Sequence, residues 1–141
     1  MSKAVLFFAD GTEECEALLV ADLLRRARVE VIIASAMGRR ALVSSHGIHL
    51  NADALAEDVD YSDVDMVILP GGIPGTPNLA ENKTVTDTCV SFAKAGKKVA
   101  AICAAPASSP ASACWKAGTP PPTPDFRTSW PVPSSTMRKS S

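Results

Sequence analysis

The sequence predicts an α/β fold built around a mostly parallel sheet. Short apolar runs alternate along the chain with segments of helical periodicity, as in consecutive strand–helix–strand units. The apolar runs lack the polar alternation of half-exposed strands, which is typical of strands buried on both faces of a parallel sheet. With 141 residues, 46% of them hydrophobic and 21% charged, the chain has the size and composition of one ordinary domain.

The first half of the chain predicts a strand, a helix, a second strand and a hairpin. Turn residues Asp10–Thr12 end the first apolar run, and a helical segment follows. There Leu19, Leu23 and Leu24 fall on one apolar stripe, with acids in the first turn and arginines in the last, as the helix dipole favours. The expected bounds are 4–9 for the strand, 13–26 for the helix, 30–35 for the second strand and 40–50 for the hairpin.

The second half repeats the strand–helix–strand pattern. Pro70–Gly72 breaks the third main strand, and Gly96 closes the next helix. Crossover connections between such strands make the pairing mostly parallel. The expected bounds are 64–69 for the third main strand, 84–95 for the helix and 98–102 for the fourth main strand. Sites in open α/β sheets form just beyond the carboxyl ends of strands. Three informative segments lie there, namely residues 10–16, 70–75 and 103–106.

The chain divides in composition into a body, residues 1–106, and a tail, residues 107–141. The tail holds seven of the 11 prolines and eight serines without helical or strand periodicity, a composition typical of disorder. The tail can be translated in a shifted reading frame, in which each codon's third base is joined to the first two bases of the next codon. The shifted frame permits a sequence typical of a helix that ends at glycine and is followed by the start of a strand. We therefore expect an out-of-frame tail, with a genuine Pro/Ser-rich tail as the alternative. Sequencing the encoding DNA across codons 104–116 decides between them.

Charge and hydropathy exclude several classes of protein. The net charge of −1 excludes a polybasic nucleic-acid binder. No apolar run approaches the ~20 residues that a membrane span needs. The N-terminus leads almost directly into an apolar strand-like run, without the ordered parts of a secretory signal, so a cytoplasmic protein is expected.

The four cysteines differ in what they predict. Their spacing matches no metal-binding pattern, and no disulfide set is expected. Cys89 lies in a helical segment and suits core packing, and Cys15 lies in an acidic turn. Cys103 follows a buried-strand pattern with small residues two positions before and after it, as in a nucleophile elbow. Such an elbow presents the sulfur at a helix N-terminus, which lowers its pKa. A closely packed strand end is an equally good interpretation of this pattern.

A reactive thiol needs a proton partner, and the histidines are poor candidates. His46 and His49 both lie in the expected hairpin and suit surface or strand positions. Carboxylates near the end of the first strand are better candidates, because a carboxyl beside a thiolate stabilises it and shuttles a proton. One of them reaches the thiol if the first and fourth main strands are neighbours. These carboxylates are Asp10, Glu13, Glu14 and Glu16.

Three motifs, occurring in order, together resemble one known family. They are Gly11–Glu16, Leu69–Gly72 and Ala100–Pro106. They resemble the ThiJ/PfpI family, in the branch of the Parkinson-disease protein deglycase and the bacterial ThiJ-like proteins, over residues 3–107. The resemblance implies a flavodoxin-like, Rossmann-like three-layer sandwich of the class I glutamine-amidotransferase type, here incomplete at the C-terminus.

The resemblance also implies roles for particular residues. Cys103 would be the nucleophile, a protonated Glu16 would donate to its thiolate, and the backbone N–H groups of Gly72 and Ala104 would hold an oxyanion. No metal or organic cofactor is implied, and the intact parent would be a homodimer. Ala104 stands where the peptidase branch has a histidine, which disfavours a peptidase. Arg28 stands where family members usually place glycine at the end of the helix.

These observations lead to three hypotheses. The first is a cysteine-dependent glyoxalase or deglycase, protective under stress, that acts on methylglyoxal or on glycated protein and nucleotide adducts. The second is a redox sensor or chaperone in which Cys103 is oxidised rather than catalytic. The third is an inactive truncation product, because a half-covered sheet folds poorly.

Overall fold

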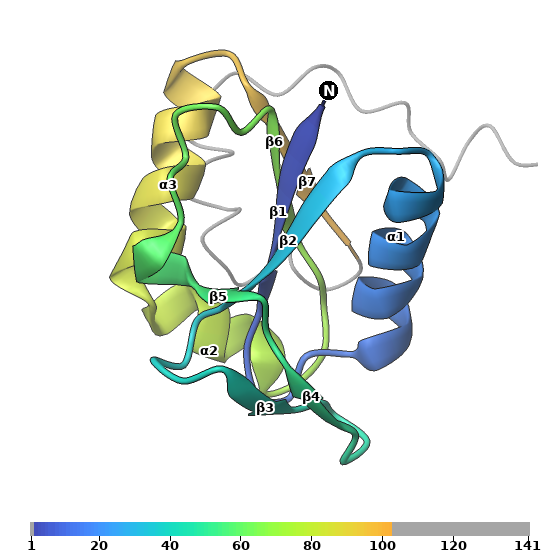
Figure 1. Cartoon of the computed structure of the whole chain (residues 1–141). Helices are drawn as coiled ribbons and strands as arrows, with labels where there is room; N and C mark the ends of the chain where they lie inside the picture. The colour runs from blue at the N-terminus through green and yellow to red at the C-terminus, as the bar shows by residue number, and fades with distance from the viewer. Residues whose placement is uncertain (1, 103–141) are drawn as a thin grey trace, which may run out of the picture.

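The centre of the molecule is a parallel sheet of five strands in the order β5-β2-β1-β6-β7 (Figure 1). The computed structural model describes residues 2–102. All neighbouring strands of this sheet pair in parallel, which confirms the expected pairing. The strands are β1 (Lys3–Phe8), β2 (Glu30–Ser35), β5 (Ala54–Leu55), β6 (Met66–Leu69) and β7 (Lys98–Ala101).

Helices cover both faces of the sheet. Figure 1 shows α1 on one side of the strands and α2 with α3 on the other. The helices are α1 (Glu14–Arg26), α2 (Gly75–Glu81) and α3 (Lys83–Lys94). Strand β1 contributes side chains to the hydrophobic cores on both faces of the sheet. Leu6 and Phe8 pack with α1, while Val5 and Phe7 pack with α3. The sequence predicted this α/β class with its parallel sheet, and the family resemblance implied the three-layer arrangement.

The expected hairpin forms beside the main sheet rather than within it. Strands β3 (Ala41–Val43) and β4 (His49–Asn51) pair antiparallel as a separate two-stranded sheet. Three short elements have no counterpart in the prediction: α2, β5 and a 3₁₀ turn, η1 (Ala56–Asp58). Within residues 2–102, no helix is long and apolar enough to cross a membrane.

Helix α1 buries only part of the leucine stripe seen in the sequence, since Leu24 packs partly buried against the core while the other two leucines are exposed. Leu19 and Leu23 are 58% and 55% exposed, whereas Ala17 and Ala21 are buried against the sheet. The helix faces the sheet with small residues, which allow its backbone to approach the strands closely. Beyond the end of α1, Arg28 adopts φ 63° in place of the usual glycine. An arginine thus adopts the left-handed backbone conformation that glycine usually provides at the end of a helix.

The first and fourth main strands are not neighbours, so that condition of the sequence argument was wrong. Strand β1 pairs with β2 and β6, and β7 pairs only with β6 among the described strands. A carboxylate at the end of β1 must therefore reach across the end of β6 to approach the end of β7. This intervening position of β6 determines how the candidate site is built.

Candidate functional site

Two of the three informative segments meet at the carboxyl ends of β1 and β6. Glu13 N donates to Gly71 O at 2.9 Å. A Cβ on Gly72 would lie 2.4 Å from Glu13 N, and Gly72 has φ 108°, so this position requires glycine. A Cβ on Gly75 would lie 2.4 Å from Thr12 N. The glycines thus allow the loop after β6 to lie directly against the start of α1.

Glu16 extends from the first turn of α1 over the end of β6. Its Oε2 atom accepts a hydrogen bond from Gly71 N at 2.9 Å. Its own backbone N donates to Glu13 Oε2 at 2.8 Å, and Glu13 thereby caps the helix. Glu16 thus contacts the residue immediately before Gly72, so the structure brings together two of the predicted site residues.

Gly72 offers a backbone donor at this junction. Its carbonyl oxygen accepts from Thr76 N at 2.9 Å, while its N–H makes no hydrogen bond within residues 2–102. Thr76 Oγ1 is a buried hydroxyl that likewise lacks a partner in the described part of the chain. The N–H of Gly72 is thus available to an acceptor at the carboxyl end of β6.

Strand β7 leads into the same region. Ala101 pairs with Leu69, and Ile102 N donates to Leu69 O at 3.0 Å, beside the last residue of β6. The predicted nucleophile Cys103 and the predicted oxyanion donor Ala104 lie outside the described residues, as does the proposed tail from 107 to 141. The described segment ends one residue before the predicted nucleophile.

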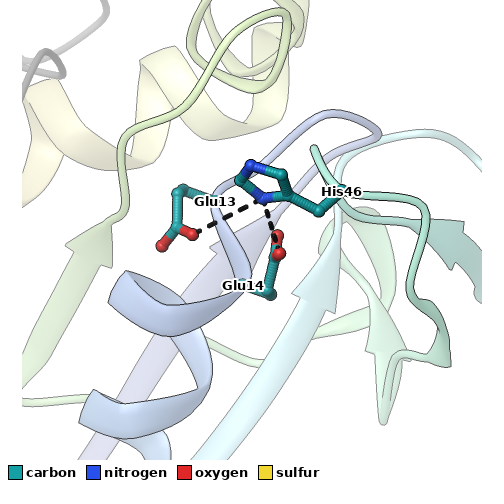
Figure 2. A group of neighbouring side chains, drawn as sticks. All are labelled: Glu13, Glu14 and His46. Carbon is teal, nitrogen blue, oxygen red and sulfur yellow. Dashed lines mark ion pairs between the residues drawn. The ribbon is translucent and has the colours of Figure 1, made fainter.

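A second group of polar side chains lies at the N-terminus of α1 (Figure 2). His46 Nδ1 lies 2.6 Å from Glu14 Oε1 and 3.8 Å from Glu13 Oε1. Ser45 Oγ donates to Glu14 Oε2 at 3.1 Å. Burial, which would raise the pKa of Glu14, is outweighed by hydrogen bonds from its own backbone and from Ser45, Ser44 and His46, which lower the pKa to about 2. Glu14 is therefore a carboxylate at neutral pH.

The β3–β4 hairpin is fastened to the end of β1 by hydrogen bonds. Gly11 N donates to Val43 O at 2.9 Å, and Ser45 N donates to Thr12 O at 2.9 Å. Asp10 Oδ1 accepts from Val43 N at 3.0 Å. These bonds hold the hairpin, and with it His46, beside the start of α1, although about thirty residues separate His46 from that helix start in sequence. The sequence placed His46 at a hairpin surface, and its side chain is indeed 71% exposed, but no local pattern indicated its contact with Glu14.

The DJ-1/PfpI family model matches residues 2–114. The chain belongs to the DJ-1/PfpI family. The match confirms the resemblance carried by the three motifs. Glu16 and Gly72 lie in two of those motifs, and Cys103 and Ala104 lie in the third.

Individual relatives agree with this assignment. The chain is 38% identical over 107 residues to "Protein dj-1beta" of Drosophila melanogaster, covering 75% of the chain and 57% of that protein. It is 30% identical over 105 residues to "Glutathione-independent glyoxalase DJR-1.2" of Caenorhabditis elegans, covering 74% and 55%. The chain thus spans little more than half the length of these curated relatives.

A solved structure confirms the flavodoxin-like α/β fold. The structure "Toxoplasma gondii DJ-1, oxidized" superposes with a TM-score of 0.76 at 33% identity, covering 79% of this chain and 61% of that one. The Drosophila DJ-1beta crystal structure gives a TM-score of 0.73 at 34% identity, covering 83% and 60%.

Proposed function

We propose that this protein is a cysteine-dependent glyoxalase or deglycase that acts on small reactive carbonyls such as methylglyoxal, or on their adducts with protein and nucleotide amines. One observation carries the proposal: the Glu16 carboxylate binds Gly71 N at the end of β6, beside the strand that leads into Cys103. A carboxyl group and an available N–H of Gly72 therefore lie at the strand ends where a family nucleophile is expected.

The proposed chemistry begins with attack of the Cys103 thiolate on the aldehyde carbon, which forms a hemithioacetal. The N–H groups of Gly72 and Ala104 stabilise the oxyanion. Glu16 moves a proton between C1 and C2, which oxidises the aldehyde carbon to a thioester and reduces the ketone to an alcohol. Water then releases lactate and regenerates the thiol, so no external oxidant or reductant is consumed.

The similarity to a C. elegans protein named as a glutathione-independent glyoxalase supports the glyoxalase reading. The deglycase reading requires the same attack on a carbonyl-derived carbon, followed by loss of an amine. A cytoplasmic homodimer completes the proposal, because the family resemblance implies a dimer.

Turnover of methylglyoxal by the purified full chain tests the proposal. We expect Cys103→Ser to abolish lactate formation and Glu16→Gln to lower kcat by roughly 10²–10⁴, the range for a positioned acid–base group. Cys15→Ser is the matched control, because Cys15 is an exposed thiol on α1, and it should retain wild-type turnover. Equal turnover by wild type and Cys103→Ser would contradict the proposal.

A redox-sensing function is the second candidate, favoured by the similarity to the structure of oxidised DJ-1 from Toxoplasma gondii. A thiol stabilised by Glu16 would be oxidised by peroxide to sulfenate and then sulfinate. Absence of turnover in a cooperatively folded protein, together with peroxide-dependent mass increase at Cys103, would favour the sensor. Absence of both turnover and a cooperative thermal melt would favour the inactive truncation product.

A further inference from the structure

We propose that Glu13, Glu14 and His46 form a binding site for a divalent transition-metal ion of the Zn²⁺ type. This proposal is separate from the chemistry at Cys103. One ligand atom from each residue lies within 4.8 Å of the others. Two of the ligands come from the start of α1 and the third from the β3–β4 hairpin, so the ion would bridge two elements of the fold (Figure 2).

The free oxygen of each carboxylate is directed at the same nitrogen. Glu13 Oε2 accepts from Glu16 N at 2.8 Å, and Glu14 Oε2 accepts from Ser45 Oγ at 3.1 Å. The remaining Oε1 atoms lie 3.8 and 2.6 Å from His46 Nδ1, respectively. A backbone N–H and a hydroxyl therefore orient the two carboxylates, as supporting hydrogen bonds do around metal ligands, and Ser45 Oγ also lies 3.1 Å from His46 Nδ1.

The distances fit a metal after small side-chain movements. Bonds of about 2.0–2.2 Å in a tetrahedral site place neighbouring ligand atoms roughly 3.3–3.6 Å apart. The two observed separations of 2.6 and 3.8 Å lie on either side of that range, so a modest shift of the exposed His46 ring equalises them.

The charge balance favours a cation despite the helix dipole. Glu14 has a side chain only 10% exposed, and Glu13 is 24% exposed. In the described part of the chain, His46 is the only basic side chain within ion-pair distance of either carboxylate. The N-terminus of α1 contributes about half a positive charge, which two carboxylates outweigh.

The ligand types select the class of ion. An imidazole nitrogen with two carboxylates suits zinc and its neighbours copper and nickel, whereas magnesium and calcium prefer oxygen ligands throughout. The His46 side chain is 71% exposed, so water can complete the coordination shell on that side. The expected site thus has three protein ligands and an open position.

Zn²⁺ binding to the full chain, measured by competition with a chromogenic chelator, tests the proposal. We expect wild type to bind one ion and His46→Gln to bind it at least tenfold more weakly. His49→Gln is the matched control, because His49 is the other exposed histidine of the same hairpin, on β4, and it should bind as wild type does. Zn²⁺ should also raise the Tm of wild type but not of His46→Gln. Circular dichroism verifies that both variants are folded.

Co²⁺ absorption identifies the ligands and separates this site from the predicted thiol. Nitrogen and oxygen ligands give weak visible bands, which Cys103→Ser should retain and Glu14→Gln should lose. Equal Zn²⁺ affinity in His46→Gln and wild type would overturn the proposal. An intense near-ultraviolet thiolate band that disappears in Cys103→Ser would also overturn it. Neither outcome depends on methylglyoxal turnover, so failure here leaves the proposed function untouched.

Discussion

The two faces of the sheet are covered by helices that pack in different ways. Helix α3 inserts Val85, Cys89 and Phe92 into the core. Tyr61 lies between Phe7 and Phe92, at 6.2 and 6.4 Å between ring centroids, and thus extends this packing. Helix α1 instead fully buries alanines, leaves Leu19 and Leu23 exposed, and packs its other leucines against the core only partly buried.

The comparison shows that the size of an apolar residue does not identify the buried face of a helix. On the α1 face, strand residues such as Leu6, Phe8 and Ile68 supply the bulk, so the helix can present Ala17 and Ala21 and approach closely. On the α3 face, the helix supplies much of the bulk itself. Both arrangements fill the space between helix and sheet, which close packing requires.

The largest loss of stability should come from truncating a large buried side chain on the α3 face. Phe92→Ala removes a side chain that is 4% exposed, packs edge-on against Tyr61 and lies 4.9 Å beneath Lys97 Nζ. We expect the free energy of unfolding to fall by about 3–5 kcal/mol, the usual cost of a large buried cavity. Urea denaturation measures the change. A loss of less than about 1 kcal/mol in the free energy of unfolding would contradict the tight packing of this face.

An intermediate effect should come from overfilling the α1 face. Ala21→Leu adds three carbons where the helix lies against the sheet, and Ala21 is only 3% exposed. We expect a loss of about 1–3 kcal/mol from forced side-chain and backbone shifts. Leu23→Ala is the control on the same helix and should change stability by no more than about 0.5 kcal/mol, since Leu23 is 55% exposed. The reverse order of the two losses would contradict the assigned orientation of α1.

The smallest predicted effect is a pH dependence of the free energy of unfolding that comes from α1 and not from α3. Hydrogen bonds hold the pKa of Glu14 at about 2, below its usual value, so its ionised form stabilises the folded state. This contribution is complete above about pH 5 and disappears as the pH falls toward the folded pKa. We expect the stability difference between wild type and Glu14→Gln to shrink over that interval in metal-free buffer.

Asp87→Asn is the control for the pH experiment, since Asp87 is an exposed acid on α3. Its stability difference from wild type is the reference against which the change for Glu14→Gln is read over the same interval. A Glu14→Gln difference that stays constant down to pH 2 would show that the hydrogen bonds around Glu14 do not favour its ionised form.

Local patterns predicted most of the fold, and the failures have physical causes. Residues 30–35 and 84–95 were placed within about one residue because buried runs and helical periodicity are strong signals. Helix α2 was missed because it is a single short stretch that contains Pro77. Strand β5 is two residues long and is defined only by its pairing with β2. Such an element has no local pattern to recognise.

The candidate site was likewise predicted only in part from the sequence. The proposed site residues Glu16 and Gly72 followed from the family resemblance, and the three segments at strand ends followed from the sequence. The position of β6 between β1 and β7 did not, and it determines that Glu16 contacts Gly71. The approach of His46 to Glu14 also escaped prediction.

The sequence by itself determined the α/β class, the order of the main elements and the family, because these depend on local periodicity and on short motifs. Tertiary structure decided which neighbours each strand has, which face α1 buries, and which side chains meet at the start of that helix. Those outcomes depend on packing and hydrogen bonds between residues far apart in the chain. Ser45 reaches Glu14 only because backbone bonds fasten the hairpin to the end of β1.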